Sequence, residues 1–188
     1  MLESDSIPHD PTFKRMYNII HIDEKWFYMT KKSENYYLLP DEEDQIRTCK
    51  SKNFITKIMF LVALARSQFD AQRNEIFSRK ISMFPFITKE PAKRTSIDRK
   101  TDTLETKLII LVKRDVIRLY LIDKFLPAIR EKWPREDIGN PIFIQQDNAR
   151  VHVKDDDDEF RQAATKDGFD IRLMSQSPNS PYLNILDL

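Results

Sequence analysis

An apolar residue recurs at every fourth position between Ile117 and Trp133, and this repeat predicts a long helix with one buried face. Its members are Ile117, Leu121, Phe125, Ile129 and Trp133. Residues four apart lie on the same side of an α-helix, so together they form an apolar stripe. Asp115 is placed to cap the start of this helix, and Pro127 predicts a kink within it. A helix with such a stripe must pack against a sheet or against other helices.

Before the helix, the sequence has the composition of β-strands. Residues 17–30 contain IIHIDEKWFYM, which is rich in β-branched and aromatic side chains and predicts a buried strand. Residues 36–39 predict its hairpin partner after a polar turn. Residues 54–65, FITKIMFLVALA, predict a nearly continuous apolar strand in the middle of a sheet. Residues 75–87 predict one more strand, and Trp26 is expected in the core.

After the helix, short strands and helices alternate. Residues 141–146 and 169–174 predict strands, and residues 158–165 predict a helix that starts in the acidic run DDDDE. Ser180 and Pro181 predict the start of a last helix. This order predicts an α/β fold with a mixed central sheet flanked by helices. It matches the ribonuclease-H-like order, although periodicity alone does not select that fold among α/β sheets.

The charge and cysteine content exclude several classes of protein. The 188 residues carry 31 basic and 30 acidic side chains, a net charge of +1, so any contact with DNA must use local patches. The single cysteine, Cys49, excludes an internal disulfide framework and a zinc site of paired cysteines, which is typical of a reducing compartment. No apolar run approaches the roughly 20 residues that a membrane span needs. We therefore expect a soluble intracellular protein with no membrane partner.

Three aspartates stand at informative places in this predicted order. Asp23 lies inside the first strand, Asp147 directly follows the strand at 141–146, and Asp187 lies in the last helix. In a ribonuclease-H-like sheet these two strands are neighbours and the last helix crosses their ends, so the three carboxylates would converge. Carboxylates that hold two Mg²⁺ ions suit phosphodiester cleavage. The alternative is that they are solvated or cap helices, as most aspartates are, although a charge within an apolar strand is costly without a partner.

Seven segments of the chain together resemble the plant mariner-like elements of the mariner superfamily. They are HIDEKWF, SKNFITKIMF, KEPAKRTSIDR, FLPAIREKWP, IFIQQDNARVH, GFDIRL and SPNSPYLNILDL. The most specific feature is that 39 residues separate Asp147 from Asp187, an interval typical of this plant group. The resemblance implies a tail at residues 1–17 and, at residues 18–188, the ribonuclease-H-like catalytic domain of a DDE/D transposase.

The same resemblance implies a function and a site. Asp23, Asp147 and Asp187 would be the catalytic, metal-binding triad, with Mg²⁺ or Mn²⁺ as cofactor. The implied reaction is hydrolytic nicking at transposon ends, followed by attack of the freed 3′-hydroxyl on target DNA. The implied partners are transposon-end and target DNA in the nucleus, with a homodimer as one option.

Basic residues near these motifs have two open interpretations. Arg150 could contact a phosphate or pair with an acidic neighbour, and Asn148 could orient the Asp147 carboxylate or the DNA. The densest basic stretch, in a turn-like region, could bind the DNA backbone or form a solvated loop; it contains Lys89, Lys93, Arg94, Arg99 and Lys100. His152 is expected to be a packing or capping histidine.

The chain also departs from the mariner pattern. Relatives carry a helix-turn-helix region before the catalytic domain, for which the 22 residues before Asp23 leave no room. Asp187 stands one residue from the last residue, and Tyr182 occupies a position where relatives have aspartate. We therefore expect little or no strand cleavage from this chain. A non-catalytic remnant that binds nucleic acid or a partner is the main alternative, and an unrelated ribonuclease-H-like nuclease fits the motif spacing less well.

Overall fold

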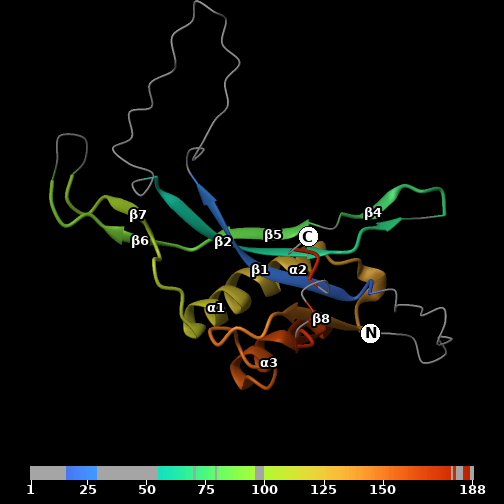
Figure 1. Cartoon of the computed structure of the whole chain (residues 1–188). Helices are drawn as coiled ribbons and strands as arrows, with labels where there is room; N and C mark the ends of the chain where they lie inside the picture. The colour runs from blue at the N-terminus through green and yellow to red at the C-terminus, as the bar shows by residue number, and fades with distance from the viewer. Residues whose placement is uncertain are drawn as a thin grey trace, which may run out of the picture. The chain divides into compact units, whose positions relative to one another are not determined.

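A computed structural model describes residues 16–28, 55–69, 71–78, 80–95, 100–178, 180 and 184–186 (Figure 1). A five-stranded sheet has the order β5–β2–β1–β8–β9. Its strands are β1 (Ile19–Tyr28), β2 (Lys57–Ala65), β5 (Lys80–Pro85), β8 (Pro141–Gln146) and β9 (Asp170–Ser175). Two smaller antiparallel pairs join β3 (Gln68–Phe69) to β4 (Glu75–Phe77) and β6 (Ile87–Pro91) to β7 (Leu104–Leu108).

Strands β1, β8 and β9 form the parallel part of the sheet. β8 pairs in parallel with β1 and also in parallel with β9. Ile20 on β1, Ile144 on β8 and Ile171 on β9 are all buried. A parallel strand between two others is covered on both faces, which explains the nearly continuous apolar sequence of β8. The predicted strands at 17–30, 54–65, 141–146 and 169–174 are confirmed within two or three residues.

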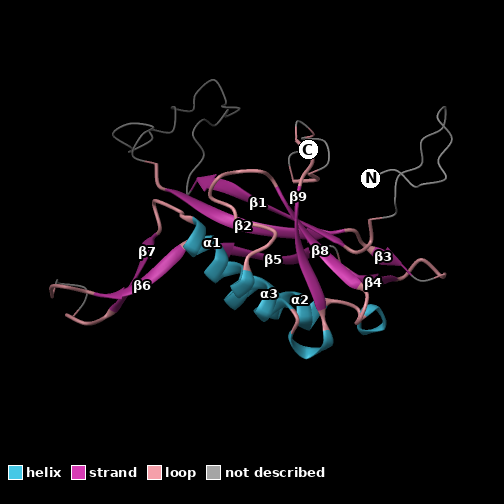
Figure 2. Cartoon of the chain, turned by 90° about the horizontal axis from the view of Figure 1, so that it is seen from below, coloured by secondary structure: helices cyan, strands magenta, loops and turns pink. Residues whose placement is uncertain are grey.

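The predicted helix with the four-residue repeat is confirmed, although it is not a regular α-helix. It consists of α1 (Arg114–Tyr120), a π-helical turn (Leu121–Phe125) and α2 (Leu126–Lys132), drawn in cyan with α3 (Asp158–Ala164) in Figure 2. All five residues of the repeat are buried, none more than 3% exposed. The kink at Pro127 stays a prediction; a π turn precedes the proline, which lies in the first turn of α2.

Two details at helix starts differ in outcome. Asp115 is not the cap of α1, because Lys113 holds that position without a side-chain hydrogen bond. Asp115 instead lies in the first turn and pairs with Arg118 at 3.1 Å, Oδ1 to Nη1. The acidic run does start a helix as predicted: Asp157 caps α3 by accepting a hydrogen bond of 3.0 Å from the amide of Phe160. In the described residues, no helix is long and apolar enough to cross a membrane.

Three further predictions are wrong or lie outside the described residues. The single strand predicted at 75–87 is wrong, since this stretch divides among β4, β5 and the start of β6. Pro85 and Pro91 lack the amide donors that a continuous ladder needs, and they end β5 and β6. The predicted strand at 36–39 and the start of the last helix at 181–183 lie outside the described residues. Residues 184–186, where that helix is predicted to continue, form a turn instead of a helix.

Trp26 was expected in the core and is not there. It is 44% exposed at the distal end of β1, where the burial of successive side chains declines. The ammonium of Lys57 lies 4.1 Å from the centre of its ring, a cation–π contact. The rings of Phe27 and Phe60 meet edge to face with centroids 5.1 Å apart.

Contacts along the chain divide it into two compact units. The first unit comprises Met1–Asp23, Val62–Met83 and Val112–Leu188, and the second comprises Glu24–Leu61 and Phe84–Leu111. The first unit contains α1, α2, α3, β8, β9 and the first half of β1. The second contains β6 and β7, which form a hairpin.

Candidate functional site

The register of β1 and β8 relates Asp23 to Asp147. The last paired residues are His21 and Gln145, each two positions before its aspartate. Continuing this parallel register by two residues sets Asp23 opposite Asp147, and neighbouring strands lie about 4.8 Å apart. Both aspartates belong to the first unit. The two strands are neighbours as the sequence predicted; Asp23 lies in the middle of β1 and Asp147 directly follows the end of β8.

The Asp147 carboxylate is oriented by contacts within its own loop. Its Oδ1 accepts a hydrogen bond of 2.7 Å from the amide of Ala149. The ring Nδ1 of His152 lies 2.8 Å from the same Oδ1 and 3.0 Å from the backbone oxygen of Asp147. The side chain of Asp147 is 50% exposed, whereas that of His152 is 4% exposed. One oxygen of the Asp147 carboxylate is therefore held by the Ala149 amide and the buried His152 ring, while the side chain as a whole remains half exposed to solvent.

His152 thus does more than the sequence indicated. It is buried, as expected for a packing histidine, and it also contacts the carboxylate five residues earlier in the chain. A sequence signal existed in its position: a histidine shortly after an aspartate at a strand end can fold back onto that aspartate through a tight loop. His152 donates its own amide to the carbonyl of Ala149 at 3.0 Å, which closes that loop.

Side-chain amides tie the loop to the ends of β8 and β9. The Nε2 of Gln146, a buried residue, donates to the carbonyl of Val153 across the loop. Asn148 donates through Nδ2 to the carbonyl of Gln176 at 2.7 Å. The amide of Gln176 in turn donates to the carbonyl of Gln146 at 2.8 Å. Asn148 therefore links two strand ends in this structure, and its side chain does not contact the Asp147 carboxylate.

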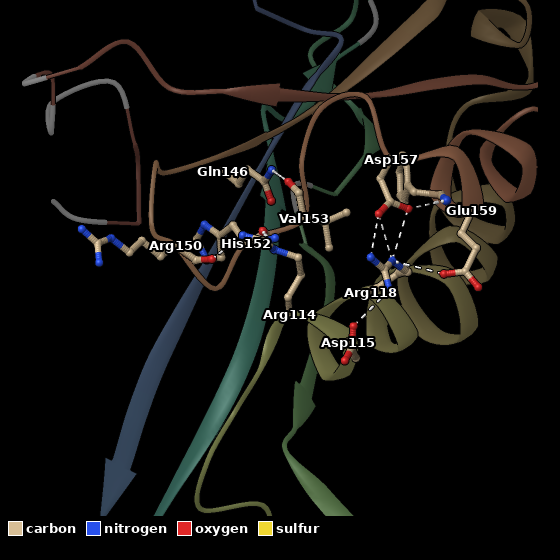
Figure 3. A network of polar contacts seen from close by, with 10 residues as sticks. Arg114, Asp115, Arg118, Gln146, Arg150, His152, Val153, Asp157 and Glu159 are labelled. Carbon is tan, nitrogen blue, oxygen red and sulfur yellow. Dashed lines mark hydrogen bonds and ion pairs between the residues drawn. The ribbon is translucent and has the colours of Figure 1, made fainter.

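Arg114, at the start of α1, holds the same loop from the other side (Figure 3). Its Nε donates to the carbonyl of His152 at 2.8 Å, and its Nη2 donates to the carbonyl of Arg150 at 2.6 Å. The sequence carries no sign of this role of Arg114, because the residue lies outside the apolar stripe and its acceptors are backbone atoms 36 and 38 residues away.

One turn further along α1, Arg118 joins that helix to the start of α3 (Figure 3). Its Nη2 lies 2.8 Å from Oδ2 of Asp157, and its Nε lies 3.3 Å from Glu159. Burial raises the pKa of Asp157, but the hydrogen bonds from Arg118 and from the Phe160 amide outweigh it and hold that pKa below its ordinary value. Asp157 is therefore ionised at neutral pH, and the ion pair fixes α1 against α3.

A buried polar pair underlies the two aspartates. His21 is 5% exposed and Gln145 is 2% exposed. Each lies two residues before its aspartate, so a regular strand directs it to the same face of the sheet. Nδ1 of His21 has no hydrogen-bond partner in the described part of the chain. Burial lowers the pKa of His21, so its imidazole is neutral near pH 7.

The donor set at this end of the sheet suits a hard cation. Aspartate oxygens are the ligands that Mg²⁺ and Mn²⁺ prefer. The residues that the structure describes contain no group of three or more His, Cys, Asp or Glu side chains able to hold a metal. Asp187, the third candidate ligand, lies outside the described residues. The structure therefore places two of the three candidate ligands.

The candidate DNA-binding residues fall in two places. Arg150 is exposed in the loop after β8, where it has no ion pair with any described residue. Lys93, Arg94 and Lys100 are exposed in the connection between β6 and β7, in the second unit. That connection is closed by a hydrogen bond of 2.9 Å from the Ala92 amide to the Thr103 carbonyl and by a contact of 2.7 Å between the hydroxyls of Thr95 and Thr101. Arg99 lies outside the described residues.

Comparison with known proteins gives structural neighbours only. No protein-family model matches this sequence, and no curated protein matches it. A pre-cleavage Mos1 transpososome has a TM-score of 0.50 at 17% identity, covering 92% of this chain and 40% of its own. A Mos1 transposase paired-end complex with left transposon end has a TM-score of 0.45 at 17% identity, with coverages of 90% and 38%. A Mos1 mariner paired-end complex with Mn has a TM-score of 0.44 at 17% identity, with coverages of 83% and 35%.

This chain therefore spans well under half of the length of the transposase chains that it resembles. At 17% identity the likeness establishes the fold alone, and the transpososome with a TM-score of 0.50 is the neighbour that supports it. The element order and the strand order β5–β2–β1–β8–β9 agree with that fold. The chain has a ribonuclease-H-like α/β fold, with a mixed central sheet flanked by helices, of the kind found in the Mos1 mariner transposase.

Proposed function

We propose that this chain derives from the catalytic domain of a mariner-type DDE/D transposase, of the plant mariner-like group, a domain for metal-dependent DNA cleavage and strand transfer at transposon ends. The observation that supports this proposal is the parallel pairing of β1 with β8, because its register, continued by two residues, would set Asp23 opposite Asp147. The motif segments and the 39-residue interval to Asp187 support it from the sequence. The solved neighbours include complexes with a transposon end and with Mn.

Asp23, Asp147 and Asp187 are the proposed ligands of Mg²⁺ or Mn²⁺. When bound, these ions would stabilise charge on phosphate oxygens and activate the attacking water or hydroxyl. The residues of the chain itself supply orientation. The Ala149 amide and the His152 ring fix Oδ1 of Asp147, and no hydrogen bond to a described residue engages its Oδ2. Hydrogen-bonded carboxylates of this kind are typical of metal sites.

DNA contacts are proposed for the exposed basic residues in both units. Arg150 is exposed in the same loop as Asp147, three residues on, and is proposed to contact a phosphate near the reacting one. The connection between β6 and β7 offers Lys93, Arg94 and Lys100, with Arg99 between them in sequence. Because the net charge is only +1, we expect weak binding that depends on these local groups and falls with salt. Because the proposed DNA partners are nuclear, we propose that the protein acts in the nucleus.

Mn²⁺ binding tests the proposed site directly. We expect Mn²⁺ to broaden the NMR signals of residues near Asp23 and Asp147, because two carboxylates and water can hold a hard cation weakly. The double variant Asp23→Asn, Asp147→Asn should lose this broadening, since amide oxygens carry no charge. The measurement is a titration of isotope-labelled protein with Mn²⁺.

Asp156→Asn is the matched control for this titration. Asp156 is an exposed aspartate in the segment that follows the Asp147 loop, so its replacement removes one of the two charges that the double variant loses, without touching the proposed site. The control should broaden like the unmutated chain. Equal broadening in the double variant would rule out Asp23 and Asp147 as the metal ligands.

DNA binding by the β6–β7 connection should appear in its salt dependence. Replacing Lys93, Arg94 and Lys100 with serine should make the negative slope of log affinity against log salt shallower by about 2–3, because each phosphate contact on duplex DNA contributes about 0.9 to its magnitude. Fluorescence anisotropy with a short duplex at several salt concentrations measures this slope. A variant with serine at the exposed residues Lys124, Arg161 and Lys166 removes the same charge elsewhere and should change the slope less. Equal slopes in the two variants would assign no specific role to the connection.

A further inference from the structure

We propose that Arg114 is a positioning residue for the candidate site, holding the loop 147–153 so that His152 fixes the Asp147 carboxylate. This inference rests on the proposed function, because it treats Asp147 as a metal ligand. Arg114 itself contacts neither aspartate; it acts through two backbone carbonyls and one histidine ring (Figure 3).

Arg114 holds the loop through two hydrogen bonds from its guanidinium. Nε and Nη2 of one guanidinium donate to the carbonyls of His152 and Arg150, two residues apart, at 2.8 and 2.6 Å. Hydrogen bonds from a charged donor are stronger than neutral ones, and the planar fork sets the spacing between the two carbonyls. A lysine has a single ammonium and cannot reproduce that spacing. The guanidinium therefore fixes both the place and the curvature of the loop.

The second step carries the constraint from the loop to the carboxylate. His152 is held at both ends: its carbonyl by Arg114, and its ring Nδ1 by the carboxylate and backbone oxygen of Asp147. Its amide also donates to Ala149, whose own amide donates to Oδ1 of Asp147. These hydrogen bonds connect Arg114 to the Asp147 carboxylate through His152 and Ala149. A displacement of the His152 backbone therefore changes the orientation of the carboxylate.

The third step explains why the loop needs an outside anchor. The side chains from Asp147 to Val151 are all exposed, so the loop has little apolar packing to hold it. Its two ends are tied by the bond from Gln146 to Val153. Helix α1, by contrast, is firmly placed by its buried residue Ile117 and by the pairing of Arg118 with Asp157. Arg114 transfers the rigidity of α1 to the loop.

The test compares three variants of the full 188-residue chain. Arg114→Gln removes both carbonyl contacts, and Arg114→Lys keeps the charge without the fork. Arg130→Gln is the matched control, because Arg130 on α2 also donates to a backbone carbonyl, that of Ala163 at 2.5 Å, but far along the chain from the loop. Two quantities are measured for each: hydrogen exchange of the Ala149 and His152 amides, and Mn²⁺ affinity by electron paramagnetic resonance.

In Arg114→Gln we expect the exchange rate of both amides to rise about tenfold, because the charged hydrogen bonds that hold the loop are lost. We also expect the Mn²⁺ affinity to fall about tenfold, as it does when other residues that orient metal ligands are replaced. Arg114→Lys should be intermediate and remains informative if the glutamine variant fails to fold. Arg130→Gln should match the unmutated chain in both measurements.

Unchanged exchange in both Arg114 variants would overturn the proposal, as would faster exchange with unchanged Mn²⁺ affinity. If the unmutated chain bound no Mn²⁺, the proposed metal site would be wrong. The exchange rates would then decide by themselves whether Arg114 holds the carboxylate in place.

Discussion

Replacement of Asp147 by asparagine is expected to lower Mn²⁺-dependent nicking of supercoiled DNA by about 1,000-fold or more. A metal ion contributes several kcal/mol to stabilising phosphoryl charge in the transition state, and about 1.36 kcal/mol corresponds to a factor of ten in rate. Loss of about 4 kcal/mol therefore removes three orders of magnitude. Asparagine preserves the shape of the side chain and can still accept the Ala149 amide, so the fold should survive. The assay counts single nicks over long incubations.

The control for this assay is again Asp156→Asn, which should nick at the unmutated rate. Nicking that persists in Asp147→Asn would show that the activity arises elsewhere in the preparation or in the chain. A complete lack of nicking by the unmutated protein, combined with salt-dependent DNA binding, would favour the non-catalytic remnant over the enzyme.

Phe125→Ala should destabilise the first unit by about 3–5 kcal/mol, the usual cost of deleting a fully buried aromatic side chain. Phe125 is 0% exposed and ends the π-helical turn. A domain of this size is stable by about 5–15 kcal/mol in total, so the variant should unfold at a much lower urea concentration. The measurement is the urea midpoint followed by circular dichroism.

Leu119→Ala is the comparison for that variant. Leu119 lies on α1 and is 55% exposed, so its truncation should change the free energy of unfolding by no more than about 0.5 kcal/mol. Similar losses in both variants would mean that the buried stripe contributes less to stability than its packing indicates.

The sequence predicted the parts of the fold that depend on regular periods. The apolar repeat from Ile117 to Trp133 and the apolar run of β8 each bury one consistent set of side chains, and such patterns are visible in residue types. The neighbouring of β1 and β8 followed from the ribonuclease-H-like order, and the parallel register confirms it. The acidic start of α3 followed from the preference of helix N-termini for negative charge.

The parts that the sequence did not predict depend on contacts with the backbone or on local geometry. Arg114 binds carbonyls, which every residue possesses, so nothing in the types of residues 150 and 152 marks them as its acceptors. The hairpin of β6 and β7 was not predicted because prolines and charged residues interrupt the alternation of apolar and polar side chains that marks a strand. Trp26 was misplaced because its composition resembles a core strand, while its place at the distal end of β1 leaves it exposed.

The π-helical turn at Leu121–Phe125 has a consequence for the phase of the helix. Four residues of α-helix rotate by about 400°, so each step of a four-residue repeat drifts by about 40°, and Trp133 would lie about 160° from Ile117. A π turn acts as one inserted residue that does not advance the following helix. Counted without it, the five repeat positions fall within about 80° of one another, as a single buried face requires. Removing one residue between Leu121 and Phe125 would therefore leave the later side chains facing the same way, whereas the same deletion in α2 would rotate the residues after it by about 100°.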